Sequence, residues 1–296
     1  MSKKFQPMLA EDAEDINALQ YPVIASPKLD GIRCVIRDGV ALSRSLKPIR
    51  NKTVQAWAAE HWEFLERLDG ELVAGEHDEG VFQRSQSTIM SAKGGGQWAF
   101  WCFDLDDTLP YLERIRQIKT GVNLVGAPPK FKLVPMKRCR TPEELRAFEE
   151  ECLNRGFEGV MIRKPDGPYK YGRSTLKEGY LLKLKRFTDA EATIIGWDEL
   201  MSNQNEEKRD ARGKINRSRN RDGLVPAGVL GALHVRGPDG THFKVGSGFT
   251  AAQRAELWKM KNKLMNRIIK FKWQEAGTKD KPRCPIFLGF RDPEDV

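Results

Sequence analysis

A lysine just ahead of an Asp-Gly pair is the residue of this chain best suited to covalent chemistry. It lies in the segment Ser26-Pro27-Lys28-Leu29-Asp30-Gly31-Ile32-Arg33. A lysine amine attacks phosphorus only when it is unprotonated, so Lys28 needs burial or neighbouring cations that disfavour the charged form. Asp30-Gly31 permits a tight turn, and Arg33 offers a planar donor fork to a ribose or a phosphate. A short Lys-x-Asp-Gly segment is more often a solvated turn, so its meaning depends on its companions.

Two carboxylates stand immediately before apolar strand-like runs. Glu71 lies in Asp69-Gly70-Glu71-Leu72-Val73, and Glu158 opens Glu158-Gly159-Val160-Met161-Ile162-Arg163. As a pair they suit a ribose hydroxyl and a divalent metal, whereas each alone also fits an exposed strand end.

Basic and aromatic side chains supply three further candidates. Lys183 and Lys185 alternate with leucines, so strand geometry places both on one face, where they suit a phosphate or simply an amphipathic edge. The run 100–104 (Phe-Trp-Cys-Phe-Asp) is an aromatic strand whose rings pack in a core or stack on a base. Arg283 and Arg291 flank a late apolar strand and suit a leaving pyrophosphate or a charged tail.

The bulk properties favour a polyanionic partner. The chain has 296 residues, a net charge of +9 and a pI near 9.3, so it has room for two domains and attracts phosphates. It shows no long apolar run and no signal peptide. Its five cysteines are scattered and its four histidines lack zinc spacing. We expect a cytoplasmic monomer with reduced thiols, no membrane partner and no obligate protein partner.

Two domains are expected from the order of the elements. Residues 1–187 alternate strands (31–43, 97–105, 159–163) with helices (52–67, 141–155), which predicts an α+β domain with antiparallel sheets and flanking helices. Residues 188–296 read as strands 192–197, 230–236, 242–245 and 268–273 around a helix at 251–266, with a hairpin turn at Pro238-Asp239-Gly240. A C-terminal OB-fold β-barrel fits this order.

A strongly basic insertion at about 201–223 interrupts the second domain. Between residues 208 and 221 a single acidic residue, Asp210, accompanies seven basic ones: Lys208, Arg209, Arg212, Lys214, Arg217, Arg219 and Arg221. Composition favours a disordered, solvated loop in the free protein, and ordering on a nucleic-acid backbone is compatible with it.

In this order the segments resemble the motifs of the covalent nucleotidyltransferase superfamily, and within it the minimal virus- or phage-type ATP-dependent DNA ligases. The resemblance covers nearly the whole chain. The segments similar to motifs I, Ia, III, IIIa, IV, V and VI are 28–33, Ser43-Arg44, 69–72, Phe103-Asp104, 158–163, 183–185 and 283–291.

The resemblance implies nick sealing in three steps. Lys28 attacks the α-phosphorus of ATP, AMP moves to a 5′-phosphate, and the 3′-hydroxyl displaces it. The resemblance implies that Ser26 and Pro27 bind the nucleotide, that Arg33 and Glu71 hold the ribose, and that Phe103 and Met161 enclose adenine. Lys183 and Lys185 would neutralise the α-phosphate, and Glu71 and Glu158 would bind Mg²⁺, with Mn²⁺ as an alternative. Arg283 and Arg291 would bind the pyrophosphate.

The resemblance also places DNA contacts and shows departures. Arg44 and Arg173 match positions near the nick phosphates, and the basic insertion corresponds to a latch around duplex DNA. Leu46 stands where larger ligases often have glycine, and Arg163 stands where lysine is common.

Two rival functions remain open at this point. An RNA ligase or a GTP-dependent capping guanylyltransferase shares the lysine chemistry. A non-catalytic OB-type nucleic-acid-binding protein would need none of Lys28, Glu71 and Glu158.

Overall fold

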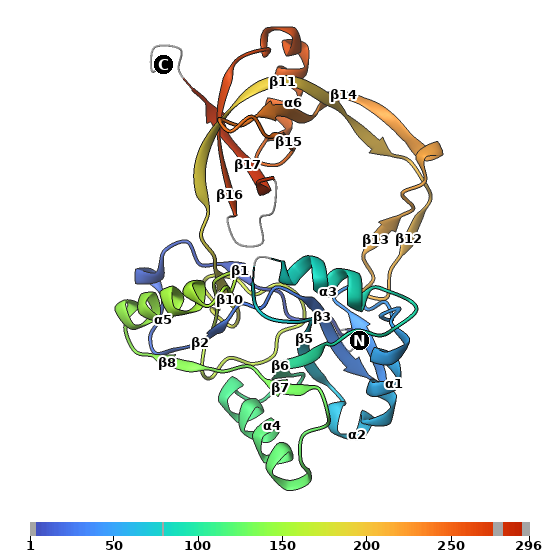
Figure 1. Cartoon of the computed structure of the whole chain (residues 1–296), viewed down its shortest axis with the longest axis vertical. Helices are drawn as coiled ribbons and strands as arrows, with labels where there is room; N and C mark the ends of the chain where they lie inside the picture. The colour runs from blue at the N-terminus through green and yellow to red at the C-terminus, as the bar shows by residue number, and fades with distance from the viewer. Residues whose placement is uncertain (1–3, 79, 275–280, 292–296) are drawn as a thin grey trace. The chain divides into compact units, whose positions relative to one another are not determined.

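The computed structural model describes residues 4–78, 80–274 and 281–291. The chain divides into two compact units, Met1–Lys185 and Arg186–Val296, whose elements are labelled in Figure 1. Within the described ranges, no helix combines the length and the apolar character needed to cross a membrane. All five cysteines are free thiols, and only Cys284 is exposed.

The first unit contains two five-stranded sheets. One has the order β1-β10-β9-β2-β8, and the other has the order β4-β3-β5-β6-β7. Both are antiparallel except for the pairs β1/β10 and β6/β7. The strands of the first sheet are β1 (Glu11–Asp12), β2 (Val23–Pro27), β8 (Lys137–Cys139), β9 (Val160–Arg163) and β10 (Leu182–Leu184). Those of the second are β3 (Ile32–Arg37), β4 (Val40–Ser43), β5 (Leu68–Val73), β6 (Ala99–Leu105) and β7 (Phe131–Leu133).

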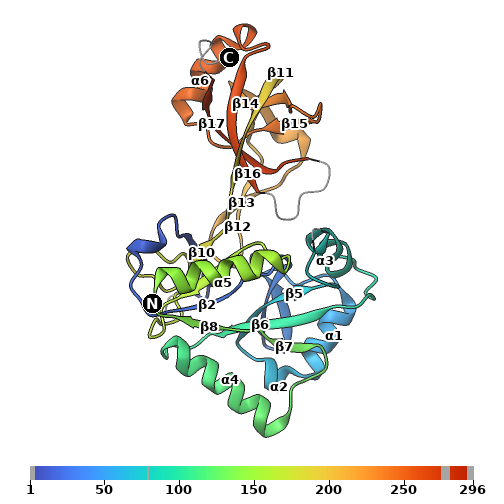
Figure 2. The same ribbon diagram turned by 60° about the vertical axis from the view of Figure 1, so that its left-hand side comes forward.

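Helices flank these sheets, as Figure 2 shows for α4 and α5. Helices α1 (Lys52–Glu60), α2 (Trp62–Leu65) and α4 (Tyr111–Val125) pack on the second sheet through Trp57, Leu65 and Ile118. Helix α5 (Pro142–Asn154) packs on the first sheet through Leu145 and Phe148. Helix α3 (Val81–Ile89) and the 3-10 turn η1 (Ile16–Ala18) complete the unit.

Strand periodicity decides which side chains of β5 face the helices. Leu68 and Leu72 belong to the core beneath α1, α2 and α4, whereas Val73 belongs to the core of the first sheet. Successive strand residues alternate faces, so Glu71 shares the face of Val73, away from those helices.

Local signals predicted one helix well and missed a break in another. Thr141 caps α5 by accepting from Glu144 N at 3.3 Å, with Pro142 in the first turn. The helix predicted over 52–67 is divided at His61, where no glycine or proline marks the break. Leu46 adopts φ +59°, a conformation that glycine takes without steric cost, which explains why glycine suits this turn.

The main sheet described in the second unit is five-stranded and antiparallel, with the order β15-β14-β11-β16-β17. Its strands are β11 (Thr188–Asn203), β14 (Leu224–Arg236), β15 (His242–Val245), β16 (Ile268–Gln274) and β17 (Arg283–Phe290). The predicted OB-type barrel is an open sheet rather than a closed one. Among the described residues its two edges meet at an isolated bridge between Ser247, which follows β15, and Ile286 in β17. The expected helix at 251–266 is shorter, with α6 (Ala251–Lys259) followed by the 3-10 turn η3 (Lys261–Lys263).

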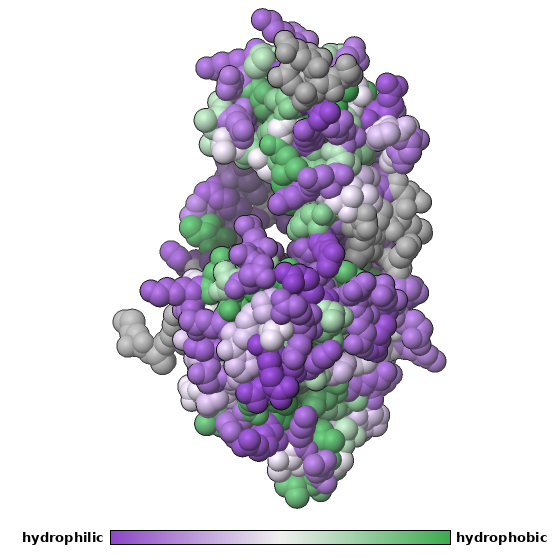
Figure 3. Space-filling model, turned by 90° about the vertical axis from the view of Figure 1, so that its left-hand side faces the viewer, coloured by the Kyte–Doolittle hydropathy of each residue, from purple (hydrophilic) through white to green (hydrophobic). Residues whose placement is uncertain are grey.

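The basic insertion forms a hairpin rather than the loop that its composition favours. Strands β12 (Glu207–Arg209) and β13 (Ile215–Arg217) pair in antiparallel register, and the 3-10 turn η2 (Arg221–Gly223) leads into β14. Arg217 donates to the carbonyls of Asn203 and Asn205 at 2.9 and 3.2 Å. Backbone pairing and these side-chain contacts order the segment, and neither can be predicted from the number of charged residues. The face drawn in Figure 3 is mostly hydrophilic, with hydrophobic residues in smaller groups.

Candidate nucleotide-binding and active site

Lys28 lies in a compact cluster with one carboxylate and a second lysine. Its amine donates to Glu158 Oε2, and Lys185 Nζ lies 3.4 Å from Glu158 Oε1. The Glu158 side chain is 5% exposed, against 19% for Lys28 and 18% for Lys185. Burial is the main cause that lowers the pKa of Lys185, and the positive charges of Lys28 and Lys183 act in the same direction.

Backbone hydrogen bonds fix this cluster. Lys28 N donates to Gly159 O at 2.8 Å, and Glu158 N donates to Lys28 O at 3.3 Å, which extends the β2/β9 pairing beyond the strands. Gly159 has φ +140°, and a Cβ there would lie 2.3 Å from Leu184 O. Glycine at this position therefore allows the chain to approach the end of β10, immediately before Lys185.

Arg33 is held by a buried network. Its guanidinium donates twice to Asp69, each time at 2.5 Å, and once to Met8 O at 3.2 Å. Tyr169 donates its hydroxyl to Asp69 Oδ2 at 2.5 Å and accepts from Met8 N at 3.2 Å. Burial raises the pKa of the Tyr169 hydroxyl well above its ordinary value, so it stays a donor. The pKa of Arg33 is also raised, because the charge of Asp69 and its hydrogen bonds outweigh the opposing effect of burial.

Glu71 is a carboxylate of the candidate site whose pKa is raised. It pairs across the sheet with Arg33, and burial raises its pKa to about 7 although Arg33 and Lys28 act in the opposite direction. Within the described part of the chain its side chain has no hydrogen bond or ion pair, unlike Asp69 beside it. A cation bound at Glu71 would therefore contact a carboxylate whose burial is only partly offset by the charges of Arg33 and Lys28.

The residues expected around the nucleotide fall on neighbouring strands. Ser26, Met161 and Lys183 occupy one row across β2, β9 and β10, and buried Pro27 comes next before Lys28. Met161 packs against the small cluster of Met8, Tyr169 and Leu181, whereas Phe103 packs with the core of the first sheet. The guanidinium of Arg33 lies 4.7 Å from the centre of the Phe103 ring.

Arg163 has a defined partner behind Phe103. It donates to Asp104 Oδ2 at 2.6 Å, and the wholly buried Arg114 donates to the two Asp104 oxygens at 2.7 and 3.2 Å. Arg114 also donates to the carbonyl of Gly167 at 2.9 Å. The arginine at the end of β9 is therefore part of a buried ion-pair network next to an expected adenine contact.

The other expected residues lie outside this cluster. Arg44 is exposed in the turn after β4, and Arg173 is exposed and donates to Ala10 O at 2.5 Å. Arg283 opens β17 and Arg291 follows its end, 3.4 Å from Glu191, so both belong to the second unit. Of the seven basic residues of the hairpin segment, Lys214, Arg219 and Arg221 have no side-chain partner in the described ranges, whereas Lys208, Arg209, Arg212 and Arg217 have partners nearby.

Sequence reasoning missed three residues that position the site. Tyr169 anchors Asp69, Arg114 anchors Asp104, and Asp12 pairs with Lys183 at 3.1 Å. From the sequence, Asp69 is recognised only as the first residue of the segment 69–73 and has no predicted role of its own. No local pattern marks Tyr169 or Arg114, because their partners are 100 and 10 residues away and both are reached through the fold.

A lysine and a carboxylate at adjoining strand ends of an α+β unit, followed by an open five-stranded sheet, form the arrangement expected of a two-unit nucleotidyltransferase. The chain belongs to the family of ATP-dependent DNA ligases: residues 7–185, more than half of its length, match "ATP dependent DNA ligase domain", and residues 225–291 match "DNA ligase OB-like domain". The predicted α+β fold class and the predicted ligase family are thereby confirmed.

Related sequences agree with this assignment. The chain is 25% identical to the DNA ligase of Haemophilus influenzae over 275 residues, which cover 89% of this chain and 85% of that protein. It is 26% identical over 196 residues to a probable DNA ligase of Dictyoglomus thermophilum. That match spans 59% of this chain but only 33% of the longer relative.

Solved structures extend the similarity to both units. The Chlorella virus DNA ligase-adenylate is 36% identical, with a TM-score of 0.55 and coverage of 97% of this chain and 99% of that one. A Lig E DNA ligase structure is 24% identical with a TM-score of 0.72, and this shows the shared fold.

Proposed function

We propose that this chain seals nicks in duplex DNA by means of ATP and a lysyl-AMP intermediate formed on Lys28. The observation that carries the proposal is the buried contact of Lys28 with Glu158, with Lys185 on the other oxygen of the same carboxylate. In a chain of the ATP-dependent DNA ligase family, this arrangement suits a lysine nucleophile, because a carboxylate that can accept its proton and a cation that can contact the phosphate both lie beside it.

In the first step the Lys28 amine attacks the α-phosphorus of ATP. A phosphorus–nitrogen bond forms, the bond to the bridging oxygen breaks, and pyrophosphate leaves. Glu158 already accepts a hydrogen bond from Lys28, so it is placed to take the proton that the amine must lose. Lys185 lies beside the same carboxylate and contributes positive charge to the α-phosphate.

The nucleotide is held by the rows of side chains on the first unit. Arg33, fixed by Asp69, serves the ribose together with Glu71 and the segment Ser26-Pro27. Phe103 and Met161 belong to different hydrophobic clusters, and we propose that they contact the two faces of adenine. Lys183 shares a row with Met161 and joins Lys185 at the phosphate.

Glu71 fits a divalent cation better than Glu158 does. Mg²⁺ is commonly bound by one or two carboxylates together with substrate phosphates and waters, so it needs no cage of ligands. The described ranges contain no group of three or more His, Cys, Asp and Glu residues suited to a metal. Burial raises the pKa of Glu71 despite the charges of Arg33 and Lys28, whereas two lysines already contact Glu158. When bound, Mg²⁺ or Mn²⁺ would neutralise charge on the phosphates.

Basic residues of the second unit would contact the pyrophosphate and the DNA. Arg283 and Arg291 would bind the leaving pyrophosphate in the first step. Later, AMP passes from Lys28 to the 5′-phosphate of the nick, and the 3′-hydroxyl attacks that phosphate and releases AMP. Arg44 and Arg173 would lie along the nick phosphates, and the hairpin β12/β13 with its flanking basic residues would grip the duplex as a latch.

Substrate choice tests this proposal. The purified protein is incubated with a nicked DNA duplex, or with a nicked RNA duplex, in the presence of ATP or GTP, and joined strands are counted. We expect the protein to join the DNA duplex with ATP but not with GTP. We also expect it to sediment as a monomer. Preferential joining of RNA, or covalent labelling by GTP, would favour an RNA ligase or a capping enzyme instead.

A further inference from the structure

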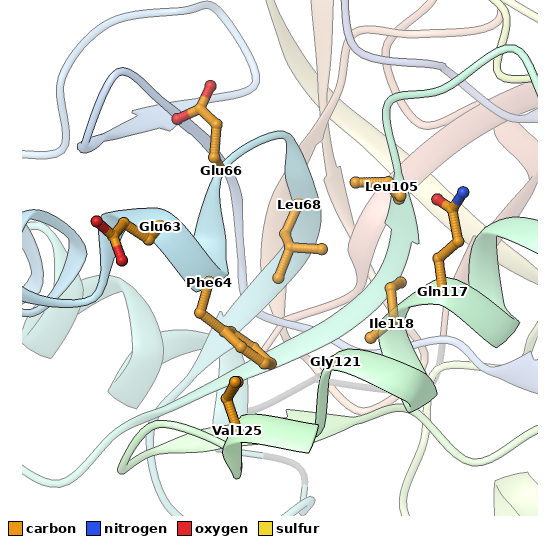
Figure 4. A pocket seen from close by; sticks show the side chains of 9 residues that line it. All are labelled: Glu63, Phe64, Glu66, Leu68, Leu105, Gln117, Ile118, Gly121 and Val125. Carbon is orange, nitrogen blue, oxygen red and sulfur yellow. The ribbon is translucent and has the colours of Figure 1, made fainter. Parts of the chain in front are cut away.

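The first unit has an apolar groove between α2 and α4. It has a volume of about 420 Å³ and is floored by Phe64, Leu68, Leu105 and Ile118, with Val125 at one end. Figure 4 shows Phe64 and Val125 turned toward each other, while the carboxylates of Glu63 and Glu66 point away from the apolar side chains at one margin. The floor is the outer edge of the core beneath these helices.

A more polar hollow and several exposed apolar side chains adjoin this groove. The hollow, of about 460 Å³, shares Glu63, Phe64 and Val125 with the groove and adds Glu60 and Trp62. At the end of α4, Leu124 is 78% exposed and Val125 is 75% exposed, and Trp62 on α2 is 49% exposed. Contiguous exposed apolar side chains of this kind are typical of surfaces that bind another molecule.

The charge of the rim indicates what that molecule carries. Glu60, Glu63 and Glu66 line the two hollows, and Glu60 and Glu63 have no side-chain partner within the described residues. The nearby Arg67 is paired with Asp107. In a chain with a net charge of +9, this local group of carboxylates repels nucleic acid and attracts a cation.

The groove lies across the second sheet from the nucleotide site. Leu68 belongs to the core under α2 and α4, whereas Glu71 on the same strand shares its face with Val73 in the other core. A molecule bound in the groove would therefore leave Lys28 and its neighbours accessible.

We propose that this groove docks a short segment of a partner protein that carries an apolar side chain flanked by lysine or arginine. Recognition would combine an apolar anchor beside Phe64 and Val125 with ion pairs to Glu60 and Glu63, as peptides bind in grooves elsewhere. The proposal concerns recruitment of the protein and does not depend on the ligation mechanism.

The test uses two labelled synthetic peptides, an amphipathic leucine/lysine peptide and its leucine/glutamate counterpart, titrated with the full chain in a fluorescence anisotropy assay. The leucine/lysine peptide is expected to bind at least about tenfold more tightly than its counterpart. Val125→Asp and Glu63→Lys should each weaken this binding about tenfold. Met90→Asp, at an exposed apolar residue after α3, is the matched control and should change binding by less than about twofold.

Three results would overturn the proposal: no binding of the leucine/lysine peptide, equal binding of both peptides, or wild-type binding by Val125→Asp and Glu63→Lys. Sedimentation of the protein alone provides a separate check, because a dimer that Val125→Asp dissociates would identify a second copy of this chain as the occupant. Self-labelling with ATP is measured on every variant and should stay unchanged. A variant that binds normally but fails to label would instead bear on the proposed function.

Discussion

Gly159→Ala should test whether the position of Lys185 beside Lys28 and Glu158 matters for activity, because the substitution changes no charged group. A Cβ at residue 159 would lie 2.3 Å from Leu184 O and 3.2 Å from Lys185 Cα. Atoms this close must separate to about 3.0 Å, so the backbone beside Lys185 moves by about 0.7 Å. A misplacement of ~1 Å in an active site can cost on the order of 10²-fold in rate. We therefore expect lysyl-AMP formation to slow by about 10- to 100-fold.

The assay is a single-turnover measurement of label transfer from ATP labelled at the α-phosphate, together with thermal unfolding. Gly95→Ala is the control, because Gly95 also has a positive φ, +94°, but no atom lies within 4 Å of a Cβ there. Both variants carry backbone strain of about 1–3 kcal/mol, and only Gly159→Ala carries the clash. Equal labelling by Gly159→Ala and the wild type would refute the idea that this close approach positions Lys185.

Three further predictions concern the residues around Arg33. Asp69→Asn should lower the free energy of unfolding by about 3–5 kcal/mol in urea titrations, because it leaves the buried Arg33 charge uncompensated; a loss below about 1 kcal/mol would contradict this. Tyr169→Phe should cost only about 1 kcal/mol but raise the KM for ATP in steady-state assays, since Asp69 loses one of the donors that fix it, and an unchanged KM would remove Tyr169 from the site. The pKa of Glu71 is raised from 4.5 to about 7 in the folded state, so its contribution to stability is complete below pH 4.5 and is lost as the pH rises through 7. Glu71→Gln should therefore gain stability relative to the wild type between pH 5 and 8, and a constant difference in unfolding free energy across this range would contradict the raised pKa.

The sequence supplied candidate site residues but not the contacts between them. Lys28, Glu71, Glu158 and Lys185 were found from short motifs, because each motif combines a charged side chain with strand or turn signals. Their contacts were not predictable locally: Lys28 and Glu158 are 130 residues apart and meet only through the pairing of β2 with β9. Strand register is set by tertiary packing, which a motif does not encode.

The errors in element boundaries have similar causes. The apolar spacing of 52–67 continues through His61, so periodicity predicted one helix where the fold makes two. In the basic segment, charge count favoured a loop, whereas β12 and β13 continue the long ribbon of β11 and β14 as a hairpin. Neighbouring structure overrides local composition in both cases.

Locating the covalent AMP tests the account most directly. The protein is incubated with ATP and a divalent cation without DNA, digested, and sequenced by tandem mass spectrometry, with Lys28→Ala treated in parallel. The account predicts one AMP adduct on the amine of Lys28 and none in the variant. An adduct on another residue, or labelling that survives Lys28→Ala, would contradict it.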